Sequence, residues 1–253
     1  VLTGGSSLYM PPFEYVEAFA ATQDHPFPYT REPEPGTNPF YRRNSVGLHY
    51  HKFYLTPYWD PEGGVAVDAS YQYGVPIFGM HQEYHLVQGQ FSSVKSFPEA
   101  LANVADGPLG AWLKETRFAY RVSGGAATAD NGLLFSLGGG DRFRGFDIAQ
   151  RQGSLTWLGS LEWRVPIFQN CKFDYFDHVA GIRNVYLAPF YDVGQMYVNG
   201  KGIGDVAHAV GLGLRVDVQW IGIIERTMLR FDVAQAINVN TPTQFWFGVQ
   251  HPF

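Results

Sequence analysis

The sequence predicts an all-β fold: an antiparallel transmembrane β-barrel with roughly nine or ten strands. Three observations predict it. Apolar and polar residues alternate with a period of two over several long segments, the chain is rich in aromatic residues (16%) and glycine (29 residues), and only 16% of its residues are charged. A soluble domain usually carries about 25% charged residues. The low charge therefore indicates that something other than water covers part of the surface.

The alternation is clearest in four segments. They are residues 65–75, 154–167, 210–220 and 225–235. In the third of these, one face carries Leu212 and Leu214, and the opposite face carries Arg215 and Asp217. Weaker strands are predicted near 45–56, 80–95, 111–123 and 183–198, and a last one at 244–253. These strands are longer than the roughly 5–6 residues that are usual in globular proteins. Their length suits a bilayer, which a strand crosses in about 9–11 residues.

The alternation does not by itself say which face meets lipid. A soluble β-barrel turns its apolar face inward, whereas an outer-membrane barrel turns it outward. Charges of both signs lie close together on the polar faces, as in Glu162 and Arg164, and aromatic residues such as Trp157 and Trp220 lie near strand ends like an aromatic girdle. Both features favour contact with outer-membrane lipids. A soluble β-barrel that binds a hydrophobic ligand stays open as an alternative.

Proline content divides the chain into two parts. Residues 1–44 are rich in proline, which is confined to strand edges, so they are predicted to be an irregular lead-in with one candidate strand, near Phe13–Ala21. Residues 45–253 are predicted to form the barrel domain. From Val1 onward, no export signal is visible, in which a charged segment would precede an apolar one. Either such a signal has been removed, or the chain is the C-terminal part of a longer protein, which is the interpretation that we favour.

Composition and motifs exclude several classes of function. A net charge of −5 argues against nucleic-acid binding, and the single cysteine, Cys171, allows neither a disulfide framework nor a cysteine metal site. Gly138–Gly140 lacks the Gly-Lys-Ser/Thr of a phosphate loop, and no Gly-x-Ser-x-Gly motif of serine hydrolases occurs. We expect a non-enzymatic protein without a cofactor.

Histidines on two strands are the remaining candidates for metal ligands. His81 and His85 flank Glu83 at alternate positions, and His49 and His51 share a face of an earlier strand. Imidazole and carboxylate groups can bind zinc, but neither spacing is the helical His-Glu-x-x-His of metalloproteases. Ordinary histidines of a barrel wall explain the pattern better, so no metal is expected.

The glycine run Gly138–Gly140 leads into the tripeptide Arg144-Gly145-Phe146, and several strands and the terminal Phe253 follow. This arrangement resembles the BamA/TamA family of bacterial outer-membrane barrels, the surface-antigen domain. In that family the loop lies between the eleventh and twelfth of sixteen strands, and five strands are predicted after it here. Three further segments resemble family strands in the expected order. They are Phe190–Gly194, Gly211–Asp217 and Phe231–Ala234.

The resemblance implies that the loop folds back into the barrel. Arg144 is then the loop arginine, Gly145 allows a tight tip and Phe146 is the adjacent aromatic residue. Asp192 is the expected partner of Arg144, with Glu162 as a second acceptor, because a guanidinium matches a carboxylate bidentately. In the alternative interpretation, Arg144 lies on a solvated hairpin.

The family function implied is insertion or translocation of outer-membrane proteins in the bacterial outer membrane. Its partners would be unfolded outer-membrane clients and the assembly machinery that recognises a C-terminal strand, here marked by Gly248 and Phe253. His251 and Pro252 depart from the family pattern in that strand. The family also places POTRA domains before its barrel, and none fits here. A passive structural or pore-forming barrel is the alternative function.

Overall fold

The structure is a computed structural model that describes most of the chain. The described residues are 2–10, 14–26, 40–57, 60–75, 83–97, 107–128, 135–171, 173–175, 180–220 and 224–249. The strands are β1 (Leu2–Met10), β2 (Glu14–Pro26), β3 (Phe40–Phe53), β4 (Gly64–Gly74), β5 (Tyr84–Ser96), β6 (Arg117–Ala127), β7 (Phe135–Leu137), β8 (Arg151–Gly153), β9 (Leu155–Phe168), β10 (Phe173–Tyr175), β11 (Ala180–Val198), β12 (Lys201–Gly202), β13 (Ala207–Trp220), β14 (Ile224–Ala236) and β15 (Gln244–Val249). The helix α2 spans Pro108–Lys114.

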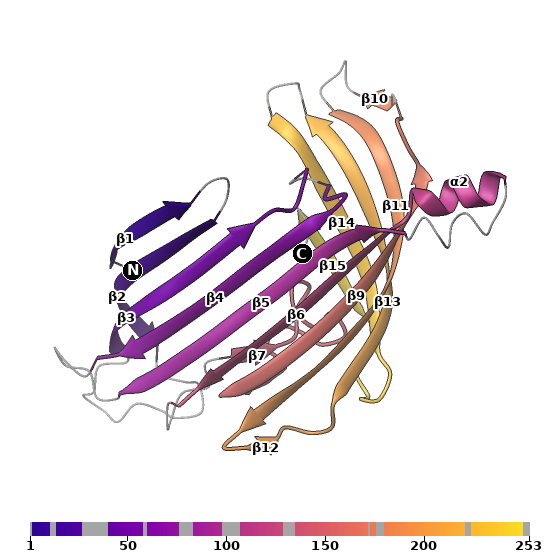
Figure 1. The fold of residues 1–253 in the computed structure, drawn as a ribbon. Coiled ribbons are helices and arrows are strands. Elements are labelled where there is room, and N and C mark those ends of the chain that lie inside the picture. Colours follow the sequence, from indigo (N-terminus) through magenta and orange to yellow (C-terminus); the bar gives the residue numbers. More distant parts are fainter. Residues whose placement is uncertain are drawn as a thin grey trace.

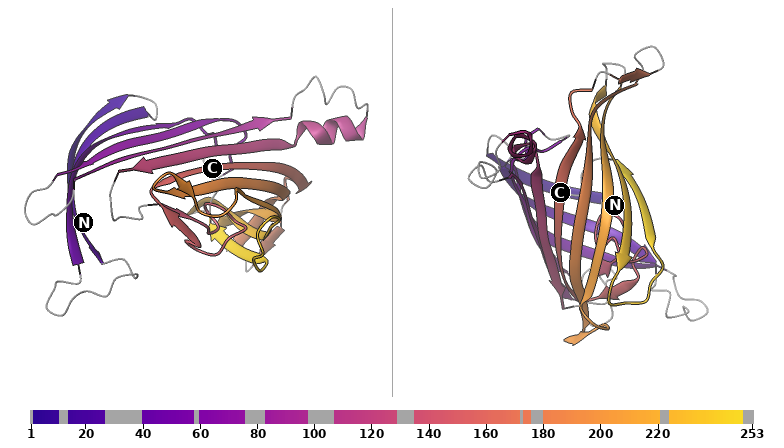
Figure 2. Two further views of the ribbon diagram at one scale, coloured as in Figure 1. Left: turned by 90° about the horizontal axis from the view of Figure 1, so that it is seen from below. Right: turned by 90° about the vertical axis from the view of Figure 1, so that its right-hand side faces the viewer.

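One large sheet dominates the molecule (Figure 1). Its 13 strands run in the order β1-β2-β3-β4-β5-β6-β9-β11-β13-β14-β15, with the short β10 and β12 paired to β11. Every pairing in it is antiparallel. The sheet curls into a trough (Figure 2), and within the described residues no pairing joins β1 to β15.

The predicted all-β antiparallel barrel fold is confirmed. Four long strands, β9, β11, β13 and β14, follow the Arg-Gly-Phe loop close to the predicted boundaries, and the fifth predicted strand is described over Gln244–Val249 as β15. The sheet order follows the chain order because successive strands are joined by hairpins or longer loops. No helix in the described part of the chain is long and apolar enough to cross a membrane.

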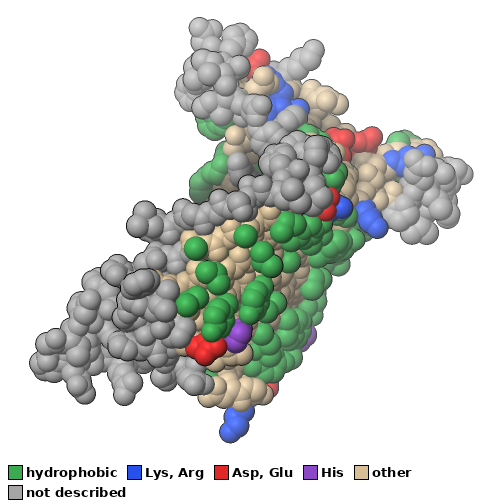
Figure 3. Space-filling view, turned by 60° about the vertical axis from the view of Figure 1, so that its left-hand side comes forward, with side chains coloured by type: hydrophobic (Ala, Val, Ile, Leu, Met, Phe, Trp, Pro, Cys, Tyr) green, Lys and Arg blue, Asp and Glu red, His purple; other side chains and the backbone are tan. Residues whose placement is uncertain are grey.

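The apolar faces of the strands point outward and the polar faces point inward. On β9, Leu161 is 47% exposed, whereas its neighbour Glu162 is fully buried. On β13, Leu212 is 47% exposed and Arg215 is fully buried. Figure 3 shows hydrophobic side chains gathered on one face, with few charged side chains among them. This is the reverse of a soluble barrel, and it is the polarity of a membrane barrel.

The strand predicted near Phe13–Ala21 is present as β2, but the prediction that the rest of residues 1–44 is irregular was wrong for its described part. Two strands, β1 and β2, occupy most of residues 2–26, and β3 begins at Phe40. The prolines explain both the expectation and its failure. Pro26 ends β2, and the others fall outside the described strands, so proline separates strands here without interrupting them.

The strand predicted near 111–123 was wrong in its first half. Residues Pro108–Lys114 form the short helix α2, and β6 begins at Arg117. Pro108 lies in the first turn of the helix, where proline is tolerated because its missing N–H has no helical partner. Leu, Ala and Lys then favour the helix over a strand.

Candidate functional site inside the barrel

The loop between β7 and β8, residues 138–150, is shaped by glycines. Gly138 and Gly139 have positive φ angles of 130° and 106°, which glycine adopts without steric cost. A Cβ at Gly138 would overlap the carbonyl oxygen of Asp147. A Cβ at Gly145 would lie 2.5 Å from the Cβ of Ala209 on β13. Gly145 therefore allows close contact between the loop tip and the barrel wall.

Arg144 is buried at the loop tip and contacts two strands of the wall. Its Nε and Nη2 donate to the two carboxylate oxygens of Asp192 on β11, at 2.8 and 2.7 Å. Its Nη1 donates to Glu162 on β9 at 3.0 Å, and Nη2 also donates to Ser160 at 3.0 Å. The guanidinium carbon lies 3.4 Å from the centroid of the Phe190 ring. The expected contacts with Asp192 and Glu162 are both present.

The surroundings of Arg144 favour its charged form. Burial lowers the pKa of its guanidinium, but Asp192, Glu162 and Asp232 outweigh burial and raise the pKa above its ordinary value. A bidentate, charge-assisted pair is among the stronger hydrogen-bonding arrangements in proteins. Such a buried pair holds only while both partners are present, so the loop position depends on each of them.

The wall around Arg144 carries further ion pairs, here called the Arg144 network. Arg215 donates to Glu162 at 2.5 and 3.1 Å and to Asp232 at 2.6 Å. Arg230 pairs with Asp141 of the loop at 2.5 Å and lies 3.4 Å from Asp232. The side chains of this network that are at most 3% exposed are Arg144, Glu162, Arg164, Asp192, Arg215, Arg230 and Asp232. Opposite charges therefore alternate across four neighbouring strands.

An apolar cluster lies beside the network. Phe143 and Phe146 of the loop are fully buried, with ring centroids 4.5 Å apart. The guanidinium of Arg151 lies 4.8 Å from the Phe146 ring. The other buried members come from the wall and from β7. They are Phe135, Leu137, Leu158, Met196, Ala207, Ala209 and Ala236. Phe146 therefore anchors the loop by packing, next to the anchor that Arg144 supplies by charge.

The C-terminal strand also holds the loop. Trp246 on β15 donates its indole N–H to the carbonyl oxygen of Arg144 at 2.8 Å. Thr241, just before β15, donates to the carbonyl of Gly145 at 3.3 Å. The Arg144–Gly145 backbone is thus bonded to the end of the chain, while the Arg144 side chain is bonded to β9 and β11.

The local structure explains why position 248, in the predicted C-terminal signal, is a glycine. It lies opposite Arg230 in the β14–β15 register, and a Cβ there would lie 3.0 Å from Nη2 of Arg230. The missing side chain leaves room for this buried guanidinium. Phe253 lies outside the described residues, and recognition of the strand by assembly machinery remains a prediction.

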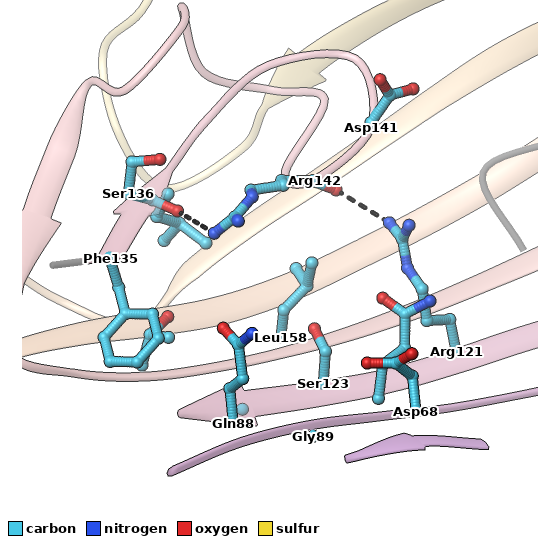
Figure 4. Close-up of a pocket in the computed structure, with 14 residues that line it drawn as sticks. Asp68, Gln88, Gly89, Arg121, Ser123, Phe135, Ser136, Asp141, Arg142 and Leu158 are labelled. Carbon is cyan, nitrogen blue, oxygen red and sulfur yellow. Dashed lines mark hydrogen bonds between the residues drawn. The ribbon is translucent and has the colours of Figure 1, made fainter. Parts of the chain in front are cut away.

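A cavity of about 270 Å³ lies between the loop and the wall formed by β4, β5, β6 and β9 (Figure 4). Arg142 closes one side and donates to the carbonyl of Ser136 at 3.0 Å. Arg121 of β6 donates to the carbonyl of Arg142 at 3.3 Å. Asp68 and Gln88 line the opposite side. Its lining mixes charged and neutral polar side chains with the apolar side chains of Phe135, Leu137 and Leu158.

The candidate metal ligands differ in their hydrogen-bond partners. Glu83 accepts a hydrogen bond from Tyr73 at 2.7 Å, and His85 bonds to the hydroxyl of Tyr71 at 2.8 Å, while His81 lies outside the described residues. His49 and His51 instead both contact Asp68. Within the described residues, these last three form the group that could hold a metal ion.

Sequence reasoning placed Arg144, Asp192 and Glu162 together. It missed Arg230, which pairs with the side chain of Asp141, and it missed the partners of the loop backbone. Arg230 could have been considered, because it lies on the polar face of its strand. Trp246 carried no such signal, because its partner is a main-chain carbonyl 102 positions away.

Comparisons with known proteins bear on the fold. No protein-family model matches the chain, and no curated protein matches it. Among solved structures, the chain is similar to BamA from Haemophilus ducreyi lacking POTRA domains 1–3, with a TM-score of 0.60 and 17% sequence identity. The match covers 94% of this chain and 51% of that one. The chain thus spans about half the length of this BamA chain and shares its barrel fold.

Proposed function

We propose that this chain is an outer-membrane β-barrel that inserts or translocates other outer-membrane proteins. The outward apolar faces and the buried charges inside support a membrane location. The structural similarity to a BamA barrel supports the proposed class of outer-membrane barrel. The observation that carries the insertion role is the edge of β15.

β15 pairs with β14 from Gln244 to Val249, and the described residues provide no partner for its other edge. Such an edge presents backbone N–H and C=O groups that can pair with an incoming strand. Its outward side chains Phe245, Phe247 and Val249 are 73%, 63% and 57% exposed. An incoming lipid-facing strand could continue both the hydrogen bonding and the apolar surface of the sheet.

The first experiment measures insertion. The purified chain is reconstituted in vesicles of phosphatidylethanolamine and phosphatidylglycerol, and a urea-unfolded eight-stranded barrel protein is added. We expect the client to fold faster than in empty vesicles, as read from heat-modifiable migration in gels. An unchanged folding rate would reject the insertion role and favour the passive barrel.

The second experiment locates the contact. In a Cys171→Ser background, disulfide cross-linking to the client is compared between two variants. They are Phe247→Cys on β15 and Phe231→Cys, at the directly paired position on β14. Adjacent strands lie about 4.8 Å apart, and a disulfide needs Cα atoms within about 7 Å. A client strand added to β15 is therefore within reach of position 247 but not of 231. Equal cross-linking at both positions would contradict edge pairing.

A further inference from the structure

Three side chains of types that can bind a metal ion converge on the inner face of β3 and β4, away from the Arg144 network. Nε2 of His49 lies 2.8 Å from Oδ2 of Asp68, and Nδ1 of His51 lies 3.1 Å from the same oxygen. All three ligand atoms lie within 4.8 Å of one another. Two imidazoles thus point at a single carboxylate.

Strand geometry explains this convergence. His49 and His51 are two positions apart, so both point to the same face of β3. Asp68 is directly opposite His51 in the β3–β4 register, which brings its side chain to the same face. Tyr15 on β2 stacks on the His51 ring with centroids 5.1 Å apart and meets the His49 ring edge-on at 5.8 Å. The two rings are therefore held in place by a neighbouring strand.

We propose that His49, His51 and Asp68 bind one divalent transition-metal ion of the zinc class. Imidazole nitrogens and a carboxylate oxygen are the ligands that zinc takes from proteins, and a site with three protein ligands leaves a fourth position open. In a tetrahedral site, neighbouring ligand atoms lie about 3.3 to 3.5 Å apart. The separations of 2.8 and 3.1 Å from Asp68 need to open by about 0.2–0.7 Å to admit the ion.

The surroundings allow both this adjustment and entry of the ion. The side chains of His49, His51 and Asp68 are 25%, 31% and 42% exposed, so they can move slightly without repacking a core. Asp68 also lines the cavity beneath the loop (Figure 4), which gives an approach to the site. Glu17 is the β2 partner of His49 in the register and adds a nearby negative charge that favours a cation. The bound ion would link β3 to β4.

The test uses the purified chain in detergent with an affinity tag that contains no histidine. Zn²⁺ alone is titrated by calorimetry, and Co²⁺ is used as a spectroscopic substitute. We expect about one ion per chain. His49→Gln, His51→Gln and Asp68→Asn should each weaken binding at least tenfold, since losing even an outer-shell partner of a metal site costs about 10–100-fold. His208→Gln is the matched control, because His208 bonds to Tyr191 on another part of the sheet.

A second variant tests ligation directly and does not depend on loss of binding. In the Cys171→Ser background, His51→Cys replaces a nitrogen ligand by a thiolate and should add a sulfur-to-cobalt charge-transfer band. The proposal is overturned if this band is absent in the folded variant. It is also overturned if the parent chain binds Zn²⁺ no better than the Asp68→Asn variant, which would leave a hydrogen-bonded His–Asp–His cluster only.

Discussion

The two sides of the curled sheet have the same strand pattern but different interiors. The inner face of β9, β11, β13 and β14 carries charged side chains that are almost completely buried beneath the loop. The inner face of β3 and β4 carries His49, His51 and Asp68, which keep a quarter to two fifths of their side-chain surface exposed. The difference comes from the loop, which covers the first wall and contacts residues of both β11 and β15.

This contrast shows that burial, more than residue type, sets what an ion pair contributes. A carboxylate under the loop has lost most of its water and depends on its arginine partner. A carboxylate on the β3–β4 wall keeps part of its hydration, so its partners contribute less. The predictions below test this difference between the two walls, from the largest expected effect to the smallest.

Replacing Arg144 should have the largest effect. Arg144→Ala leaves Asp192 buried without its ion-pair partner, whereas Glu162 keeps Arg215. We expect a loss of about 3–5 kcal/mol in the free energy of unfolding, measured by denaturant titration in detergent. Arg144→Lys should recover little, because an ammonium cannot reproduce the planar fork. Arg142→Ala, at an exposed position of the same loop, is the control. An Arg144→Ala variant as stable as this control would refute the buried-pair account.

A charge on the outer face should have the next largest effect. Leu214 points outward on β13, between the inward-facing Gly213 and Arg215. Leu214→Arg should cost about 2–4 kcal/mol if the position is at the bilayer midplane. The measurement is reversible unfolding in lipid vesicles, with Leu48→Arg on β3 as the companion variant. Equal costs would show that both walls face lipid, and no cost at either position would count against a membrane location.

Removing the indole N–H of Trp246 should have a smaller effect. Trp246→Phe keeps most of the packing but loses the hydrogen bond to the Arg144 carbonyl, at a cost of about 0.5–1.5 kcal/mol. The unfolding free energy measures this cost, and Trp157→Phe on the outward face of β9 provides the control. If the two variants lose the same amount, the bond does not help to hold the loop.

Replacing Asp68 in metal-free protein should have the smallest effect. Asp68→Asn removes the charge that His49 and His51 contact, and partly exposed pairs of this kind contribute about 0–1 kcal/mol. Unfolding in the presence of a chelator isolates this effect from any metal binding. A loss as large as that of Arg144→Ala would show that the β3–β4 wall is as tightly coupled as the loop-covered one.

The sequence predicted most of the β9–β15 wall because residues 154–167, 210–220 and 225–235 alternate clearly between apolar and polar side chains. The contact between Arg144 and Asp192 was expected from the resemblance to the BamA/TamA family. The alternation was less useful for the first 44 residues. The prolines in this segment were interpreted as a sign of irregular structure, whereas they lie at the ends of strands or between them. Nothing in the local sequence distinguishes these two cases.

Contacts between distant residues were the part that could not be predicted. Trp246 and Thr241 bond to main-chain carbonyls of the loop tip, and any residue offers such a carbonyl. The pairing of Arg230 with Asp141 joins a strand to a loop 89 positions away. Only the three-dimensional register of β14 and β15 brings these groups together.

The bond from Trp246 to the loop tip has a mechanical consequence. In the proposed function, an incoming client pairs with or displaces the edge strand β15. The Trp246 indole of this strand is bonded to Arg144, whose guanidinium is bonded to β9 and β11. If β15 peels away from β14, either this bond breaks or the loop is pulled with it. Separation of β15 from β14 and release of the loop are therefore coupled movements, and a force applied to one is transmitted to the other.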